Sequence, residues 1–199
     1  MKAGKLIVLL SIFGIVSLRY ASSQNLDINL LRDINVDHNK KLDPAFRIIT
    51  YSMMPVIIST PVTLYSVGYF SDDHTMKRNA VVIGASLLTT SVITGTLKYT
   101  VKRPRPFTTY PEIEKATKAI SPSFPSGHAS GAFALATSLS LAYPKWYVIA
   151  PSFTWAFAVA WSRMHLGVHY PSDVLVGILI GMGSSFLCYK INQSIVGNR

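Results

Sequence analysis

Long apolar stretches separated by short polar segments occupy most of the chain from residue 53 onward. Most of them match, or fall slightly short of, the roughly 20 residues that a helix needs to cross the hydrocarbon core of a bilayer. Any single stretch could be a buried core helix, but five close together favour a membrane protein. The sequence therefore predicts an all-α, integral-membrane bundle of five to six spanning helices. The five stretches are Met53–Phe70, Ala80–Leu97, Ala129–Tyr143, Trp146–Trp161 and Val174–Ile191.

The N-terminal region has the order of a targeting segment. Two lysines precede an apolar run at residues 6–18, and small residues follow at 21–23. This order is typical of a secretory signal peptide, while an uncleaved membrane anchor is the alternative. We therefore divide the chain into a signal peptide or anchor at residues 1–23 and a single domain at residues 24–199.

Residues 25–51 place leucines and isoleucines at helical spacing among charged residues. This pattern predicts two short amphipathic helices on the membrane surface, separated by a polar break at residues 37–41. A soluble cap packed on the domain is the alternative. His38 falls within the break, where we expect its side chain to be solvated.

Composition and charge agree with a membrane location. The chain is 49% hydrophobic and 14% charged, with a mean hydropathy of +0.33. Its net charge of +10 suits anionic lipid surfaces or phosphorylated substrates. Nucleic acid is not an expected partner, because the basic residues are scattered among apolar runs. The single cysteine, Cys188, excludes an intrachain disulfide and a cysteine-built metal site.

Basic residues in the short connections set an orientation. The connections at residues 71–79 and 144–145 contain three basic side chains, and such loops stay in the cytoplasm. Basic residues between positions 19 and 47, on the opposite side, weaken this asymmetry. We predict a bacterial-type inner (cytoplasmic) membrane protein whose N-terminus is cytoplasmic.

The loop Ser121–Ser130, S-P-S-F-P-S-G-H-A-S, has the features of a phosphate-binding turn that opens a helix. Pro125 disfavours helix at the residue before it, and Gly127 lets the backbone pass close to a ligand. Ser126 and His128 then lie at a helix N-terminus, where free N–H groups and the helix dipole favour an anion. On its own the loop also fits an ordinary helix cap with an exposed histidine.

Two further blocks accompany this loop: Lys98–Pro106, K-Y-T-V-K-R-P-R-P, and Ser162–Asp173, S-R-M-H-L-G-V-H-Y-P-S-D. Together the three blocks resemble the signature of the type 2 phosphatidic acid phosphatase superfamily, K-x6-R-P, P-S-G-H and S-R-x5-H-x3-D, at every fixed position. If the chain reverses direction at each span, all three blocks reach the same face. We therefore expect one active site at the outer membrane face, facing the periplasm or exterior.

Phosphoryl transfer without a metal requires several fixed cations and backbone donors around the phosphate oxygens. We expect Lys98, Arg105, Ser126, Gly127 and Arg163 to bind the phosphate, although each basic residue alone could have a structural role.

His169 and Asp173 are four residues apart, so one helical turn places the carboxylate beside the imidazole and fixes its tautomer. The resemblance implies that His169 is the nucleophile and forms a phosphohistidine. It also implies that His128 protonates the leaving oxygen and then activates water. No cofactor is expected. His165 lies four residues before His169, but we expect no metal there, since no third ligand is apparent and the family pattern gives this position no role.

Two neighbouring features are less determined. Lys102 and Arg103 add positive charge, either for a second phosphate or for lipid headgroups. Residues 108–120 are expected to form a mobile outer loop near the site entrance, with a part in substrate choice.

Cys188 is expected to be a small buried residue, and His74 a solvated loop residue.

The leading hypothesis is thus a metal-independent membrane phosphatase acting on a lipid phosphate or pyrophosphate monoester. A soluble secreted acid phosphatase of the same superfamily is one alternative. A non-catalytic membrane protein that binds lipid phosphates is another. The sequence does not determine the lipid or the oligomeric state.

Overall fold

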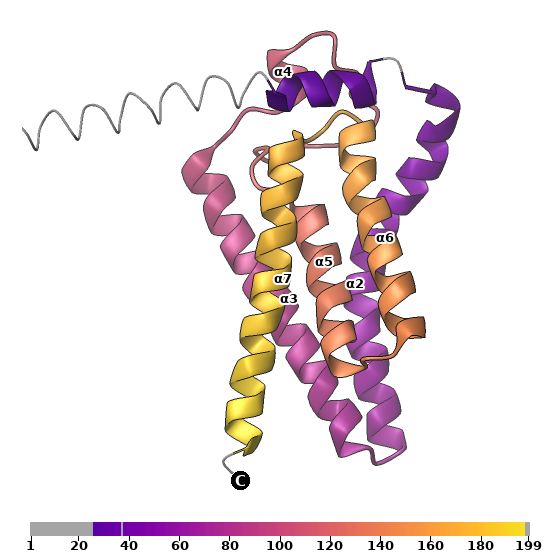
Figure 1. The fold of residues 1–199 in the computed structure, drawn as a ribbon, viewed down its shortest axis with the longest axis vertical. Coiled ribbons are helices and arrows are strands. Elements are labelled where there is room, and N and C mark those ends of the chain that lie inside the picture. Colours follow the sequence, from indigo (N-terminus) through magenta and orange to yellow (C-terminus); the bar gives the residue numbers. More distant parts are fainter. Residues whose placement is uncertain (1–25, 37, 198–199) are drawn as a thin grey trace, which may run out of the picture.

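The computed structural model describes residues 26–36 and 38–197, so the expected signal peptide or anchor at residues 1–23 lies outside the described part. Within that part the chain forms helices and no strand (Figure 1). Each predicted apolar stretch corresponds to one long helix, which confirms the all-α bundle. The long helices are α2 (Asp43–Phe70), α3 (His74–Val101), α5 (Gly127–Ala142), α6 (Trp146–His165) and α7 (Pro171–Gly197), and the short ones are η1 (Lys40–Leu42) and α4 (Pro106–Thr109).

Helix α5 runs through the middle of the bundle and packs against α2, α3, α6 and α7 (Figure 1). All of its residues from Ala129 to Ser138 are buried. Small residues make this possible, because they let helix backbones approach closely. A Cβ at Gly181 of α7, for example, would lie 2.3 Å from the Ser130 carbonyl oxygen, and one at Gly177 would lie 2.6 Å from that of Ser126.

The outer helices carry the apolar surface. Among the described residues, three helical segments are long and apolar enough to cross a membrane: Lys40–Phe70, His74–Thr109 and Pro171–Val196. Large hydrophobic side chains on them remain exposed, including Ile58, Leu88 and Leu179. Such a surface is unfavourable in water and favourable against lipid.

A helical segment at residues 26–35 lies across the end of the bundle at which α4 is found (Figure 1). Its apolar face buries Ile28 and Leu31 against Ile113 and Tyr170, which agrees with the first predicted amphipathic helix.

The second predicted amphipathic helix is wrong. After η1, α2 starts at Asp43 and continues without a break to Phe70, so residues 43–51 are its first turns. Pro44 explains this start, because proline is well suited to the first turn of a helix. The prediction of a solvated His38 is also wrong, since its side chain is only 3% exposed and contacts Asp43.

Helix α5 is the shortest of the five long helices, with 16 residues against 20 in α6 and 28 in α2. It therefore begins below the neighbouring ends of α6 and α7 (Figure 1). The connection from α4 to α5 crosses this same end of the molecule. A recessed site thus lies where α5 starts.

Candidate active site

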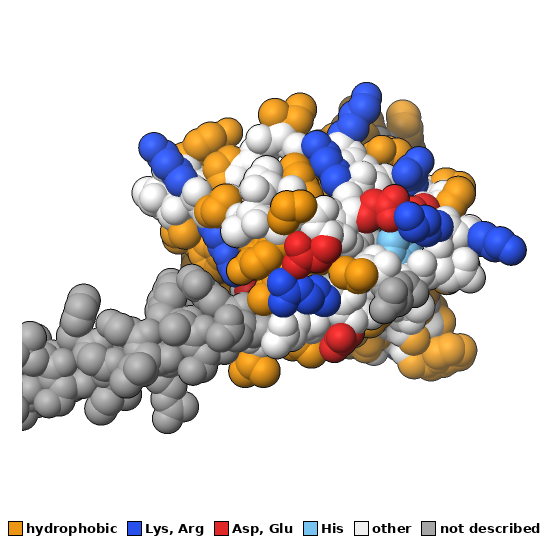
Figure 2. Space-filling view, turned by 90° about the horizontal axis from the view of Figure 1, so that it is seen from above, with side chains coloured by type: hydrophobic (Ala, Val, Ile, Leu, Met, Phe, Trp, Pro, Cys, Tyr) orange, Lys and Arg blue, Asp and Glu red, His pale blue; other side chains and the backbone are white. Residues whose placement is uncertain are grey.

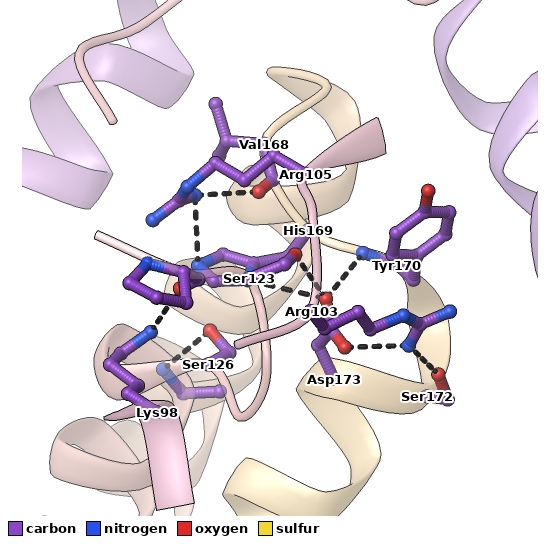
Figure 3. A network of polar contacts seen from close by, with 12 residues as sticks. Lys98, Arg103, Arg105, Ser123, Ser126, Val168, His169, Tyr170, Ser172 and Asp173 are labelled. Atoms are coloured by element: carbon purple, nitrogen blue, oxygen red, sulfur yellow. Dashed lines mark hydrogen bonds and ion pairs between the residues drawn. The ribbon is translucent and has the colours of Figure 1, made fainter. Parts of the chain in front are cut away.

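The three sequence blocks meet at the N-terminus of α5, around a cavity of about 330 Å³. Figure 3 shows labelled residues from α3 and the segment after it, from the connection before α5, and from the loop after α6 and the first turn of α7. Of the expected site residues, six line this cavity: Lys98, Arg105, Gly127, His128, Arg163 and His169.

The N-terminus of α5 is capped by a serine side chain. Ser126 is the N-cap residue, and its hydroxyl accepts a hydrogen bond from the Ala129 amide at 3.4 Å. Its own amide donates to the Asp173 carbonyl at 2.9 Å. The Ser126 side chain is completely buried and does not line the cavity. The structure therefore places its hydroxyl at the helix cap, whereas we had expected it to contact phosphate.

Two of the three cations are held in place by backbone carbonyl groups. Arg105 donates from Nε to the Ser121 oxygen at 2.7 Å and from Nη1 to the Val168 oxygen at 2.6 Å. Lys98 donates from Nζ to the Pro122 oxygen at 2.7 Å. These bonds link the first block to the other two, and they fix the positions of both charges at the cavity wall.

Arg163 provides the third cation and is 2% exposed. Its Nη1 donates to the Thr50 hydroxyl at 2.5 Å. Its Nε is buried and has no hydrogen-bond partner among the described residues. Buried polar groups are nearly always paired, so an unpaired guanidinium donor beside a cavity indicates an anionic ligand.

His169 lies in the loop between α6 and α7 and is 2% exposed. Its Nδ1 is 3.5 Å from Asp173 Oδ2, and its Nε2 is 3.4 Å from Arg105 Nη1 (Figure 3). Burial lowers the pKa of His169 to about 3, although Asp173 acts in the opposite direction. The ring is therefore neutral, and with Nδ1 turned toward the carboxylate its lone pair is on Nε2, the atom that faces Arg105 at the cavity wall.

Comparison with known proteins agrees with this geometry. A model of the PAP2 superfamily matches residues 79–196, which is more than half of the chain. The chain belongs to the PAP2 superfamily. It is 37% identical over 117 residues to an undecaprenyl-diphosphatase of Sulfolobus acidocaldarius, a match that covers 56% of each chain. It is 38% identical over 72 residues to a lipid A 4'-phosphatase of Bacteroides thetaiotaomicron, covering 36% of this chain and 32% of the relative. These matches thus span about half and a third of those relatives.

Among solved structures, this PAP2 chain resembles LpxE of Aquifex aeolicus, with a TM-score of 0.70 and 28% identity over 83% of this chain and 95% of that one. It also resembles a transmembrane PAP2 phosphatidylglycerolphosphate phosphatase of Bacillus subtilis. That match has a TM-score of 0.70 and 23% identity over 95% of this chain and 96% of the other, so it supports the fold alone. The prediction of an integral-membrane helical bundle is confirmed.

A second group of polar residues stands behind the PAP2 site. Arg103 donates to Asp173 Oδ1 and to Asp27 Oδ2, each at 2.7 Å, and its guanidinium lies 3.8 Å from the centre of the Tyr170 ring (Figure 3). Ser123 donates to the other Asp173 oxygen at 2.5 Å. Arg103 thus holds Asp173, and this internal role replaces the two roles that we had considered for it.

Sequence reasoning missed Ser123, Asp27 and this role of Arg103. Asp27 is 146 positions before Asp173 in the chain, and nothing in its neighbourhood marks it as part of the site. Ser123 lies within the loop Ser121–Ser130. Its place in this loop, two residues before Pro125, was the one sequence feature that pointed to a role in the site.

The loop at residues 108–120 is more firmly held than we had expected. The Ala116 amide donates to the Leu166 carbonyl at 3.1 Å, and the side chain of Asn35 bonds both the amide and the carbonyl of Glu114. Lys118 and Ile120 remain exposed and line the cavity. The prediction of a loop at the entrance therefore holds for residues 118–120. Residues 113–117 instead pack against the end of the bundle.

Proposed function

We propose that this chain is a membrane phosphatase that hydrolyses a phosphate or pyrophosphate monoester of a lipid. The observation that carries this proposal is the buried Arg163 with an unpaired Nε, which lines one cavity together with two further cations and two histidines. The names of the similar proteins support the same substrate class, because they include an undecaprenyl-diphosphatase and a lipid A phosphatase.

In the first step, the Nε2 atom of His169 attacks the phosphorus, and the bond from phosphorus to the leaving oxygen breaks. Lys98, Arg105 and Arg163 neutralise the phosphate oxygens, together with the free amides at Gly127 and His128 that open α5. His128, protonated in the complex with the anionic substrate, gives its proton to the leaving oxygen and becomes neutral. Asp173 keeps the His169 ring in the reactive tautomer and stabilises its positive charge.

In the second step, His128 takes a proton from a water molecule, which attacks the phosphohistidine. Inorganic phosphate leaves and both histidines return to their starting states. The three fixed cations supply the charge that a metal would supply in other phosphatases, so no metal or other cofactor is required at the phosphate.

The expected location is the inner membrane, with residues 1–23 acting as a signal peptide or anchor and five spanning helices in the rest of the chain. In this arrangement the site faces the periplasm or exterior. Figure 2 shows the corresponding end of the molecule, where basic side chains lie among acidic and apolar ones. The apolar surface of α2, α3 and α7 argues against the soluble alternative.

The orientation can be tested with two tags. A tag after Arg199 should be protected from protease in sealed right-side-out vesicles, and a tag inserted near Glu114 should be cleaved. Cleavage of both tags, or protection of both, contradicts the arrangement.

Phosphate release from a panel of purified lipids tests the activity. The wild-type protein in detergent should release inorganic phosphate from at least one class among polyprenyl pyrophosphates, phosphatidate, phosphatidylglycerol phosphate and lipid A. The His169→Ala variant is the control for contaminating phosphatases. If the wild type binds these lipids but does not exceed the variant even in a single turnover, the non-catalytic alternative is correct.

A further inference from the structure

A second cluster of titratable side chains lies at the same end of the bundle, outside the phosphate cavity. It consists of His38, which precedes η1, Asp43, the first residue of α2, and His165, the last residue of α6. The ligand atoms of the three side chains lie within 4.8 Å of one another. Our argument that His165 lacks further ligands is therefore wrong, because two of them come from parts of the chain more than 120 residues away.

Both imidazoles aim the same ring atom at one carboxylate oxygen. Asp43 Oδ1 is 3.0 Å from His38 Nε2 and 2.9 Å from His165 Nε2. The rings are T-shaped to each other, with centroids 4.5 Å apart. The side chains of His38, Asp43 and His165 are only 3%, 11% and 6% exposed. Two nitrogen atoms and one oxygen atom thus converge at a place that is almost closed to solvent.

The other ring nitrogen of His38 fixes its tautomer. Nδ1 contacts the backbone carbonyl of Asn35, which can only accept, so Nδ1 carries the proton and donates it. In its neutral form the ring turns an unprotonated Nε2 toward a carboxylate oxygen, and this pair of acceptors requires either a second ring proton or a cation bound to both atoms. An N–H donated to a backbone carbonyl is also the usual support of a metal-binding histidine.

We propose that His38, Asp43 and His165 bind one divalent metal ion, with Zn²⁺ the best match. Two imidazoles and one carboxylate are a common ligand set for Zn²⁺, with a fourth position left for water, whereas Mg²⁺ and Ca²⁺ prefer oxygen ligands. The site joins residues 38–43, around η1 and the start of α2, to the end of α6, four residues before His169. Its role is to hold these parts together, and the phosphoryl transfer does not pass through it.

The metal content of the untagged, full-length protein tests this site directly. After incubation with Zn²⁺ and desalting, the wild type should retain about one ion per chain, and His38→Ala should retain only background. His74→Ala is the matched control, since His74 also lies beside an aspartate, Asp72, but both side chains are 85% exposed. It should bind zinc as the wild type does. Equal metal content in the wild type and His38→Ala would overturn the proposal and leave a hydrogen-bonded His–Asp–His cluster.

A second measurement covers the case in which His38→Ala does not fold. X-ray absorption of the zinc-loaded wild type should show two imidazole ligands and otherwise oxygen, and Asp43→Asn should bind more weakly. Zn²⁺ should also raise the unfolding temperature of the wild type, while Mg²⁺ should not. A zinc shell without imidazole excludes the site. None of these readouts depends on phosphatase activity, so they remain informative even if the proposed function is wrong.

Discussion

Two pairs of histidines lie at the same end of this bundle, and their surroundings are opposite in charge. His128 and His169 line a cavity with four cationic side chains, those of Lys98, Arg105, Lys118 and Arg163. His38 and His165 instead converge on a carboxylate, that of Asp43. The first pair is therefore suited to an anion and the second to a cation, although the same side chain provides the chemistry in both.

The difference shows that the neighbours of a histidine decide its role. At the phosphate site the acidic partner, Asp173, is held behind the ring by Arg103 and Ser123, so that the cavity in front stays positive. At the second cluster one carboxylate oxygen faces the Nε2 atoms of both rings. Four experiments test this contrast and are given in order of decreasing effect.

The largest effect should come from His169→Ala. Without the attacking nitrogen, turnover should fall to the background rate, and no covalent phosphoenzyme should form. Rapid quenching with labelled substrate measures both, because phosphohistidine is labile in acid and stable in base. A variant that still carries the label would falsify the assignment of the nucleophile.

His128→Ala should lose roughly 10²–10⁴-fold in turnover of a lipid phosphate, as expected for removal of a general acid and base. An aryl phosphate with a good leaving group needs no proton, so this variant should still form the phosphoenzyme from it. The same quench assay compares the two substrates. An equal loss of phosphoenzyme from both would assign His128 another role.

Lys118→Ala should have a smaller effect that depends on the substrate. The exposed ammonium group at the cavity rim is expected to contribute about 0.2–1 kcal/mol to binding, which corresponds to at most about a fivefold higher KM. A pyrophosphate should be affected more than a monophosphate, because its inner phosphate, which is bonded to the lipid and is not attacked, extends toward the rim. Lys115→Ala is the control, since Lys115 lies over the Phe107 ring and does not line the cavity. Equal KM changes in both variants remove Lys118 from substrate recognition.

Chelation should have the smallest effect on catalysis. EDTA is expected to remove an ion from His38, Asp43 and His165, while the folded enzyme keeps most of its turnover because Lys98, Arg105 and Arg163 act at the phosphate. Vanadate, which mimics phosphate, should inhibit in either state. Activity that disappears with EDTA and returns with a divalent ion, while the unfolding temperature stays constant, places the metal in the reaction itself.

The sequence predicted the parts of this molecule that depend on local patterns. Apolar stretches located the five long helices, and the spacing of the three blocks located the residues around the cavity. It could not predict contacts between distant positions that follow no motif. Asp27 contacts Arg103 only because the helical segment at residues 26–35 folds over the end of the bundle. Asp43 contacts His165 because the start of α2 lies at the same end. The cap formed by Ser126 could not be told from the sequence, because a hydroxyl at a helix start can serve either the cap or a ligand.

The length of α5 determines how a lipid would reach the site. Its 16 residues span about 24 Å, several ångströms less than the roughly 30 Å of a hydrocarbon core. Because the neighbouring helices surround α5, they separate this shorter helix from the lipid tails. In the proposed orientation, the shorter helix brings the turn at Ser126 toward the boundary between headgroups and tails. A substrate could then place its phosphate in the cavity by moving sideways within its own leaflet, with its chains still in the bilayer.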